Sequence, residues 1–265
     1  MTDEEGKGWA LILGASSGFG RATAIELARA GYHIVGVHLD RKATLPQAEA
    51  VLKAIEEEGR TALFFNVNAG EAEAREQVCR AIEERFAQQG IAGALKVMLH
   101  SLAFGTLRPY LGQGGVSQAQ MEMTLNVMAH SLVYWTQEVV RRGLMGEGGR
   151  IFAMTSAGGR RVWACYGPVS AAKAALESHV RQLALELAPK GITVNAIEAG
   201  VTDTPALRKI PGWETLVEEA RRRNPSGRLT TPEDVAKTIA VLSDERTQWM
   251  TGNVIRVDGA EGIAG

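Results

Sequence analysis

Gly14-Ala-Ser-Ser-Gly18-Phe-Gly20 follows a short apolar run, Trp9–Leu13, and precedes a stretch with helical periodicity, Arg21–Ala30. Glycines at this spacing let the backbone turn tightly and approach a pyrophosphate, whose charge the N-terminus of the following helix stabilises. A glycine-rich turn alone is also a common structural element. Because this one stands between a strand pattern and a helix pattern, the sequence predicts a dinucleotide-binding fold.

The rest of the chain repeats this alternation. Short runs rich in Val, Ile, Leu and Phe predict buried strands. The seven runs are Trp9–Leu13, His33–Leu39, Thr61–Val67, Ala94–Leu99, Arg150–Met154, Thr193–Ile197 and Asn253–Val257. Helical spacing of apolar residues marks Arg21–Ala30, Pro46–Glu58, Glu71–Gln89, Gln118–Arg142, Pro168–Leu187 and Pro232–Leu242. The alternation predicts an α/β fold: one Rossmann-type, doubly wound domain over residues 1–265, with a seven-stranded parallel sheet and helices on both faces.

One region interrupts the alternation. Thr202–Thr231, between the sixth strand and the last helix, contains an additional helical stretch, Trp213–Arg223. Open α/β sheets bind ligands beyond the carboxyl ends of their strands. We therefore expect a substrate-binding insertion at about residues 202–231.

Composition excludes several classes of protein. Lys and Arg number 29 against 30 Asp and Glu, a net charge of -1, so a nucleic-acid partner is not expected. No stretch approaches the length of apolar sequence that crosses a membrane, and the first residues, MTDEEGKG, lack a secretory pattern. The two cysteines, Cys79 and Cys165, form no paired motif and suit a reducing cytoplasm. The five histidines are scattered, so no metal site is expected.

The preferred cofactor depends on the end of the second strand. Asp40 lies twenty residues beyond Gly20, where an acidic group accepts hydrogen bonds from the adenosine ribose and repels a 2′-phosphate. Arg41 and Lys42 follow at once and would attract that phosphate. We expect NAD(P)H with a slight preference for NADH; a solvated turn without cofactor contact is the alternative. Asn66, at the end of the third strand, is placed either to bind an adenine edge or to form a turn.

The glycine loop, the set Ser156, Tyr166 and Lys173, and Thr251-Gly-Asn-Val-Ile-Arg-Val-Asp258-Gly together resemble the short-chain dehydrogenase/reductase family. The resemblance runs from about Trp9 to Gly262. Ordinary members have Asn-Asn-Ala-Gly after the fourth strand and a Tyr four residues before the Lys.

Several features look like the divergent branch of that family, the enoyl-acyl-carrier-protein reductases. The fourth strand ends in His100-Ser-Leu-Ala-Phe104, and Tyr166 precedes Lys173 by seven residues. The segment Glu198-Ala-Gly-Val-Thr-Asp-Thr204 also resembles the branch. Two further segments, Leu207-Arg-Lys-Ile-Pro-Gly and Asn224-Pro-Ser-Gly-Arg228, resemble the mobile substrate loop of the branch. The alternative is that they are irregular surface connections.

One position departs from the branch. Members of the branch often carry a second Tyr ten residues before the one that corresponds to Tyr166. This chain has Ser156 there, which matches the catalytic serine of ordinary members.

The spacing between Tyr166 and Lys173 has a physical consequence. Pro168 fits the first turn of a helix, so Tyr166 should stand just ahead of that helix and Lys173 inside it. The ordinary position, four residues before the lysine, is Val169, which has no hydroxyl. The phenol must therefore reach the site from the loop.

The resemblance implies that a reduced nicotinamide gives hydride to C3 of a trans-2-enoyl thioester, as in fatty acid synthesis. Tyr166 would donate a hydrogen bond to the thioester oxygen. Lys173 would make the phenol more acidic and hold the nicotinamide ribose, and Ser156 would add a second donor or orient the carbonyl. Asn126 would anchor a proton-relay water; its alternative role is to kink or cap a long helix.

The implied contacts with the cofactor are Gly14, Ser17, Gly18, Phe19, Gly20, His38, Asp40, Asn66, Val67, Ser101, Leu102, Ala103, Lys173, Val201, Thr202 and Thr204. The implied contacts with the substrate are Phe104, Ser156, Tyr166, Leu207 and Ile210.

The acyl group would be carried by coenzyme A or by an acidic acyl carrier protein. The basic residues expected near the mouth of the site are Arg160, Arg161, Arg208, Lys209, Arg221, Arg222, Arg223 and Arg228. They would steer the carrier protein, or simply form a solvated surface. Family analogy implies a homotetramer, or a dimer, with the helices around Gln118–Arg142 and Pro168–Leu187 at the interface.

Two other functions remain open. A short-chain carbonyl reductase or alcohol dehydrogenase, acting for example on a 3-oxoacyl thioester, is favoured by Ser156 and by the missing second Tyr. A protein that senses the dinucleotide without turnover is opposed by the intact set of Ser156, Tyr166 and Lys173, because a sensor needs no phenol beside the nicotinamide.

Overall fold

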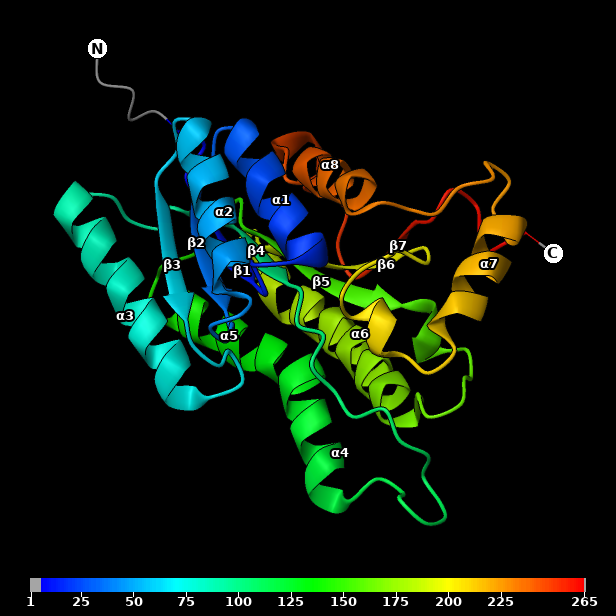
Figure 1. Cartoon of the computed structure of the whole chain (residues 1–265). Helices are drawn as coiled ribbons and strands as arrows, with labels where there is room; N and C mark the ends of the chain where they lie inside the picture. Colours follow the sequence, from blue (N-terminus) through cyan, green and yellow to red (C-terminus); the bar gives the residue numbers. More distant parts are fainter. Residues whose placement is uncertain (1–5, 265) are drawn as a thin grey trace.

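A computed structural model describes residues 6–264 and shows one parallel sheet of seven strands (Figure 1). The strands follow the order β3-β2-β1-β4-β5-β6-β7, and every neighbouring pair is parallel. Their bounds are β1 Trp9–Leu13, β2 His33–His38, β3 Ala62–Asn66, β4 Leu95–His100, β5 Arg150–Ser156, β6 Thr193–Ala199 and β7 Val254–Val257. The predicted fold class, a doubly wound Rossmann-type sheet, is confirmed.

Helices cover both faces of the sheet (Figure 1). One face carries α1 (Gly18–Arg29), α2 (Leu45–Glu57) and α8 (Pro232–Leu242), whose apolar side chains share a buried cluster with β1 and β2. The other face carries α3 (Ala72–Gln89), α5 (Ser131–Arg141) and α6 (Gly167–Leu187), with a second cluster that includes Trp135. Because apolar runs fill both faces, the strands are buried on both sides, as a parallel sheet requires.

The helix predicted over Gln118–Arg142 is present, but it is not regular along its whole length. The structure divides it into α4 (Gln118–Leu125), a π-helical turn η1 (Asn126–His130) and α5. Asn126 begins the turn, and its side-chain amide donates a hydrogen bond to the carbonyl of Gly70 at 3.2 Å. At the other end, the Ser131 hydroxyl donates back to the carbonyl of Val127 at 2.8 Å. The back-bond of Ser131 bends helices, and π-turns are frequent at functional sites.

Two strands extend beyond their predicted ends. β5 continues past Met154 to Ser156, and β6 continues past Ile197 to Ala199, because Thr155 pairs with Glu198 and Ser156 with Ala199. The apolar pattern stops at these polar residues although the ladder does not. As a result, Ser156 stands on the last position of a strand.

The segment after β6 leaves the sheet and forms a short 3₁₀ helix, η4 (Leu207–Lys209), followed by α7 (Trp213–Arg223). In Figure 1, α7 lies on the opposite side of the molecule from α3. Three further 3₁₀ turns are η2 (Ala157–Gly159), η3 (Ala188–Lys190) and η5 (Glu245–Thr247).

Within residues 6–264, no helix has both the length and the apolar character needed to cross a membrane.

Candidate active site

The predicted site residues gather at the carboxyl edge of the sheet. Gly14 follows β1, Asn66 ends β3, Ser101 follows β4 and Ser156 ends β5. The segment Val201–Thr204 follows β6. Since parallel strands end at the same edge, residues far apart in sequence share one region, next to the switch in strand order between β1 and β4.

Two positions of the glycine loop, Gly14 and Gly20, have no room for a side chain. A Cβ on Gly20 would lie 2.0 Å from the carbonyl oxygen of Gly14, and Gly14 itself has a φ of +94°. Ser17 is the N-cap residue of α1 but makes no capping hydrogen bond, and the first turn contains no acidic residue. The helix N-terminus therefore keeps backbone N–H groups for an anion, which fits the pyrophosphate of a dinucleotide.

Asp40 lies beside this loop with its carboxylate almost fully covered, at 8% exposure. His38 Nδ1 lies 2.8 Å from Asp40 Oδ2. Burial alone would raise the pKa of Asp40, but hydrogen bonds from Thr44, Ser16 and His38 hold it below the usual value. A carboxylate that stays ionised beside the loop is suited to accept ribose hydroxyl groups. Arg41 and Lys42 are exposed.

Asn66 has a structural role that the sequence did not reveal. Its side chain accepts a hydrogen bond from the backbone N–H of Asp40 at 2.9 Å and donates to the carbonyl of Asp40 at 3.0 Å. The backbone of Val67 donates to His38 at 2.9 Å. These bonds hold the turn after β2 against the end of β3. Contact of Asn66 with adenine stays a prediction.

His100, from the motif that resembles the enoyl-reductase branch, is fully buried. Its Nε2 lies 2.8 Å from the hydroxyl oxygen of Ser131, and burial lowers its pKa to about 3. A neutral imidazole therefore joins the end of β4 to α5, directly beneath the loop that carries Ser101, Leu102 and Ala103.

Tyr166 stands one residue ahead of α6, as the position of Pro168 predicts. Cys165, just before it, has a left-handed φ of 62°, which turns the chain sharply into the helix. The Tyr166 ring meets Trp163 edge-on at 5.5 Å between centroids. It also lies over Gly158, where a Cβ would be 2.3 Å from the ring. The phenol is thus firmly held, with only 7% of the residue exposed.

The expectation that Lys173 makes this phenol more acidic needs correction. Burial raises the pKa of Tyr166, and the hydrogen bond with Ser156 opposes that rise only in part. The Lys173 ammonium donates its hydrogen bond to the carbonyl of Met154, at 2.7 Å, rather than to the phenol. Because the lysine is buried beside β5, the strand carbonyl is the acceptor that it reaches. In this structure Tyr166 therefore remains a protonated hydrogen-bond donor.

Burial lowers the pKa of Lys173 to about 8, although Glu177 opposes this shift. In the unfolded chain a lysine titrates near about 10.4. Between these values the unfolded state binds more protons, so the free energy of unfolding should rise with pH in this window. Relative to a Lys173→Met variant, the wild-type protein should gain up to about 3 kcal/mol from pH 7 to 10.5. Urea denaturation measures the free energy of unfolding of both proteins across this pH range. If the two curves of free energy against pH run parallel, the charge of Lys173 is not buried.

Asn126 stands at the start of the π-turn, with its amide on Gly70. This contact ties the π-turn to the loop after β3. Participation of Asn126 in a proton relay stays a prediction.

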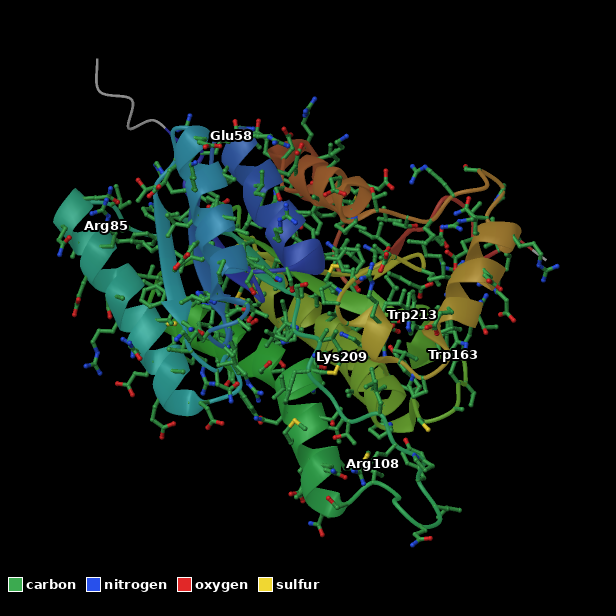
Figure 2. The ribbon with its side chains drawn as sticks, in the orientation of Figure 1. Glu58, Arg85, Arg108, Trp163, Lys209 and Trp213 are labelled. Atoms are coloured by element: carbon green, nitrogen blue, oxygen red, sulfur yellow. The ribbon has the colours of Figure 1, made fainter. Side chains whose placement is uncertain are left out.

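The candidate substrate residues border the same edge. Phe104 is 60% exposed, whereas Leu207 and Ile210 are half-buried. Figure 2 shows Lys209 and Trp213 on the segment after β6, and Trp163 on the segment after β5.

Sequence reasoning missed Tyr110. Its ring lies on Gly167, next to Tyr166, so that a Cβ on Gly167 would be 2.6 Å from Tyr110 Cζ. No sequence signal links these positions, because 57 residues of chain separate them and the contact exists only in the fold.

Half of the basic cluster expected at the mouth is paired with acidic residues. Arg208 pairs with Asp203 at 2.7 Å, and Arg228 pairs with Asp234 at 2.6 Å. Arg160 and Arg223 also have acidic partners, Glu198 and Glu261 respectively. Half of the eight cations are therefore engaged within the chain, which weakens the field that would attract an acidic carrier protein.

The motif Glu198–Thr204 indicated no separate role for Glu198. It is 2% exposed on β6 and pairs with Arg160, while Arg256 Nε lies 3.4 Å from its Oε1. Arg160 belongs to the loop between Ser156 and Tyr166, so this buried acid anchors that loop to the sheet. An acidic residue inside an apolar strand pattern was the available signal.

Across residues 6–264, no three His, Cys, Asp or Glu side chains come together as a metal site would need.

Comparison with known proteins gives a consistent picture. The family model described as enoyl-(acyl carrier protein) reductase matches residues 14–260. The chain is 30% identical over 259 residues to the enoyl-[acyl-carrier-protein] reductase [NADH] of Aquifex aeolicus (strain VF5), covering 97% of this chain and 92% of that protein. It is also 32% identical over 255 residues to the 3-oxoacyl-[acyl-carrier-protein] reductase of Aggregatibacter actinomycetemcomitans, covering 94% and 97%. The crystal structure of the Aquifex aeolicus VF5 reductase superposes with a TM-score of 0.83 at 27% identity, covering 97% of both chains.

Proposed function

This chain belongs to the enoyl-(acyl carrier protein) reductase family of short-chain dehydrogenases/reductases, and from that premise we propose that it reduces the C2=C3 double bond of a trans-2-enoyl thioester. It is an oxidoreductase that uses a nicotinamide cofactor. One observation carries the proposal: Tyr166 stands ahead of α6, seven residues before the buried Lys173.

The cofactor site would be formed by the glycine loop, the N-terminus of α1, Asp40 and the segment Val201–Thr204. When bound, a reduced nicotinamide supplies the hydride that adds to C3 of the enoyl group. As C3 is reduced, negative charge grows on the thioester oxygen, and a protonated Tyr166 donates a hydrogen bond to it. Ser156, which lies close enough to the phenol to lower its pKa, would orient that hydroxyl. Addition of a proton at C2 completes the reduction.

The position of the phenol favours this reaction over ketone reduction. Tyr166 stands ahead of α6, whereas Val169, four residues before Lys173 and inside the helix, has no hydroxyl to serve a ketone in the ordinary way. The second candidate, a 3-oxoacyl thioester reductase, is favoured by a different observation: Ser156 ends β5 and contacts Tyr166, as the serine of ordinary family members implies.

A substrate panel tests the choice. Purified protein is mixed with NADH or NADPH, and loss of absorbance is followed with crotonyl-CoA and with acetoacetyl-CoA. Faster turnover of the enoyl compound is expected. Faster turnover of the oxo compound would replace this proposal by the second candidate.

We propose NADH as the preferred cofactor, because Asp40 places a buried, ionised carboxylate where a 2′-phosphate would approach. Asp40→Asn keeps the shape and removes the charge. It should raise kcat/KM for NADPH by about tenfold while changing the value for NADH much less. Glu57→Gln, an exposed charge removal on α2, serves as the control. An unchanged ratio between the two cofactors would assign the preference to another residue.

A homotetramer is the proposed assembly. β7 pairs only with β6 among residues 6–264, which leaves one sheet edge open. Trp249 is 95% exposed and Met250 40% exposed near that edge. An open edge can pair with another chain, and apolar surface beside it is typical of an interaction site. Light scattering after gel filtration measures the assembly.

A further inference from the structure

The last described residues form a turn that contacts the end of α7 and the loop after β6. The carboxylate of Asp258 accepts hydrogen bonds from the backbone N–H groups of Ala260, at 3.0 Å, and Gly262, at 2.9 Å. This turn directs Glu261 inward, where only 5% of the residue is exposed. A carboxylate is rarely buried to this degree unless it is paired.

The two oxygens of Glu261 bind two different segments. Oε2 accepts a hydrogen bond from the backbone N–H of Val201 at 3.0 Å. Oε1 accepts one from Arg223 Nη2 at 3.1 Å. Val201 belongs to the loop after β6, and Arg223 is the last residue of α7. One buried carboxylate therefore joins the proposed nicotinamide side of the site to the helix on its substrate side.

Other residues are fitted to this contact. A Cβ on Gly200 would lie 2.9 Å from Glu261 Oε2 and 2.4 Å from the hydroxyl oxygen of Thr230, so only glycine lets the carboxylate approach. Asn224, directly after α7, donates to the carbonyl of Asp258 at 3.0 Å. The end of α7 is thus tied twice to the C-terminal turn.

Arg223 depends on the same carboxylate. Its Nε is buried without a hydrogen-bond partner in the part of the chain that the structure describes. If α7 moved away, Glu261 would keep the N–H of Val201 but lose its cation, leaving an unpaired buried charge. The positions of α7 and of Val201 are therefore energetically linked.

We propose that Glu261 is a positioning residue that couples α7 to the loop after β6. Binding of the acyl substrate and binding of the nicotinamide then both depend on this one carboxylate. This inference rests on the proposed function, in which Val201 borders the nicotinamide.

Three variants separate the two halves of the contact. Arg223→Met removes only the tie to α7. Glu261→Gln keeps an oxygen that accepts from Val201 but removes the charge. Glu261→Ala removes both. Arg80→Met makes the same chemical change at an exposed ion pair of α3, with Glu76, and is the control.

Two quantities are measured: the NADH dissociation constant, by fluorescence titration without thioester, and KM for crotonyl-CoA. Arg223→Met and Glu261→Gln should each raise KM about fivefold to tenfold and leave the NADH dissociation constant within about twofold. Glu261→Ala should also weaken NADH binding about tenfold, because the N–H of Val201 loses its acceptor. The Arg223→Met/Glu261→Gln double variant should show no further rise in KM.

The proposal is overturned if folded Glu261→Ala binds NADH like the wild type, if Arg223→Met matches Arg80→Met, or if the two single effects add. The NADH titration needs no turnover, so it decides the matter even if no thioester is reduced, an outcome that would refute the proposed function alone. Should Glu261→Ala fail to fold, Glu261→Gln remains informative. Tryptic cleavage after Arg221 and Arg222 should then be at least about fivefold faster than in the wild type; equal rates would overturn the coupling.

Discussion

Replacing Tyr166 by phenylalanine is expected to lower kcat for crotonyl-CoA by about a hundredfold or more, the usual scale for losing one donor to a developing oxyanion. The ring should stay in place, because Gly158 and Trp163 hold its faces and edge rather than its hydroxyl. NADH binding and the melting temperature should therefore remain close to those of the wild type. Steady-state kinetics, fluorescence titration and thermal unfolding measure the three quantities.

The matched control is Tyr134→Phe, which removes a hydroxyl from a partly exposed tyrosine on α5. It should leave kcat unchanged. Ser156→Ala should cost less than Tyr166→Phe, about tenfold, because the serine acts through the phenol. If Tyr166→Phe retains activity within about threefold, the phenol is not the donor, and the mechanism proposed above is wrong.

The second large effect is expected for Gly20→Ala. The added Cβ would sit 2.0 Å from the carbonyl oxygen of Gly14 and 2.8 Å from its carbonyl carbon. Both are backbone atoms, so the clash is relieved only by shifting the start of α1 away from β1. We expect a loss of about 3 kcal/mol in unfolding free energy, at the upper end for overpacking. NADH binding should weaken at least tenfold, because the N–H groups of the helix no longer meet the pyrophosphate.

Gly146→Ala is the control for this substitution. Gly146 has no atom within 4 Å of an added Cβ, and its φ is not in the left-handed region. It should change neither stability nor NADH binding. If Gly20→Ala binds NADH as tightly as Gly146→Ala does, the dinucleotide does not lie on the glycine loop.

The fold was predictable because its signals are local. Each of the seven apolar runs became a strand, and α7 and α8 have their predicted bounds. The errors occur where a contact from elsewhere overrides the local pattern. Thr155 and Ser156 stay in β5 because β6 pairs with them. The helix predicted through Asn126 contains a π-turn there, where the Asn126 amide meets Gly70, 56 residues earlier.

The site was predictable in position but not in detail. The glycines, Tyr166 and Lys173 were identified from spacing and resemblance, which fix the element that each residue occupies. Their partners are set by the packing of distant segments. Nothing in the sequence indicates that Lys173 binds the carbonyl of Met154, or that Asn66 binds the backbone of Asp40. Glu261 gave no signal, since its two partners come from separate parts of the chain.

The burial of Lys173 has a consequence for the solution chemistry of the protein. Its ammonium has three N–H groups, and among residues 6–264 one hydrogen bond engages it, to Met154. A ribose hydroxyl reaching this side chain would stabilise its charged form and raise its pKa from about 8. Near pH 8, association with NADH should therefore draw protons from the buffer. Calorimetric titrations in buffers of different ionisation enthalpy should give different heats for the same binding event.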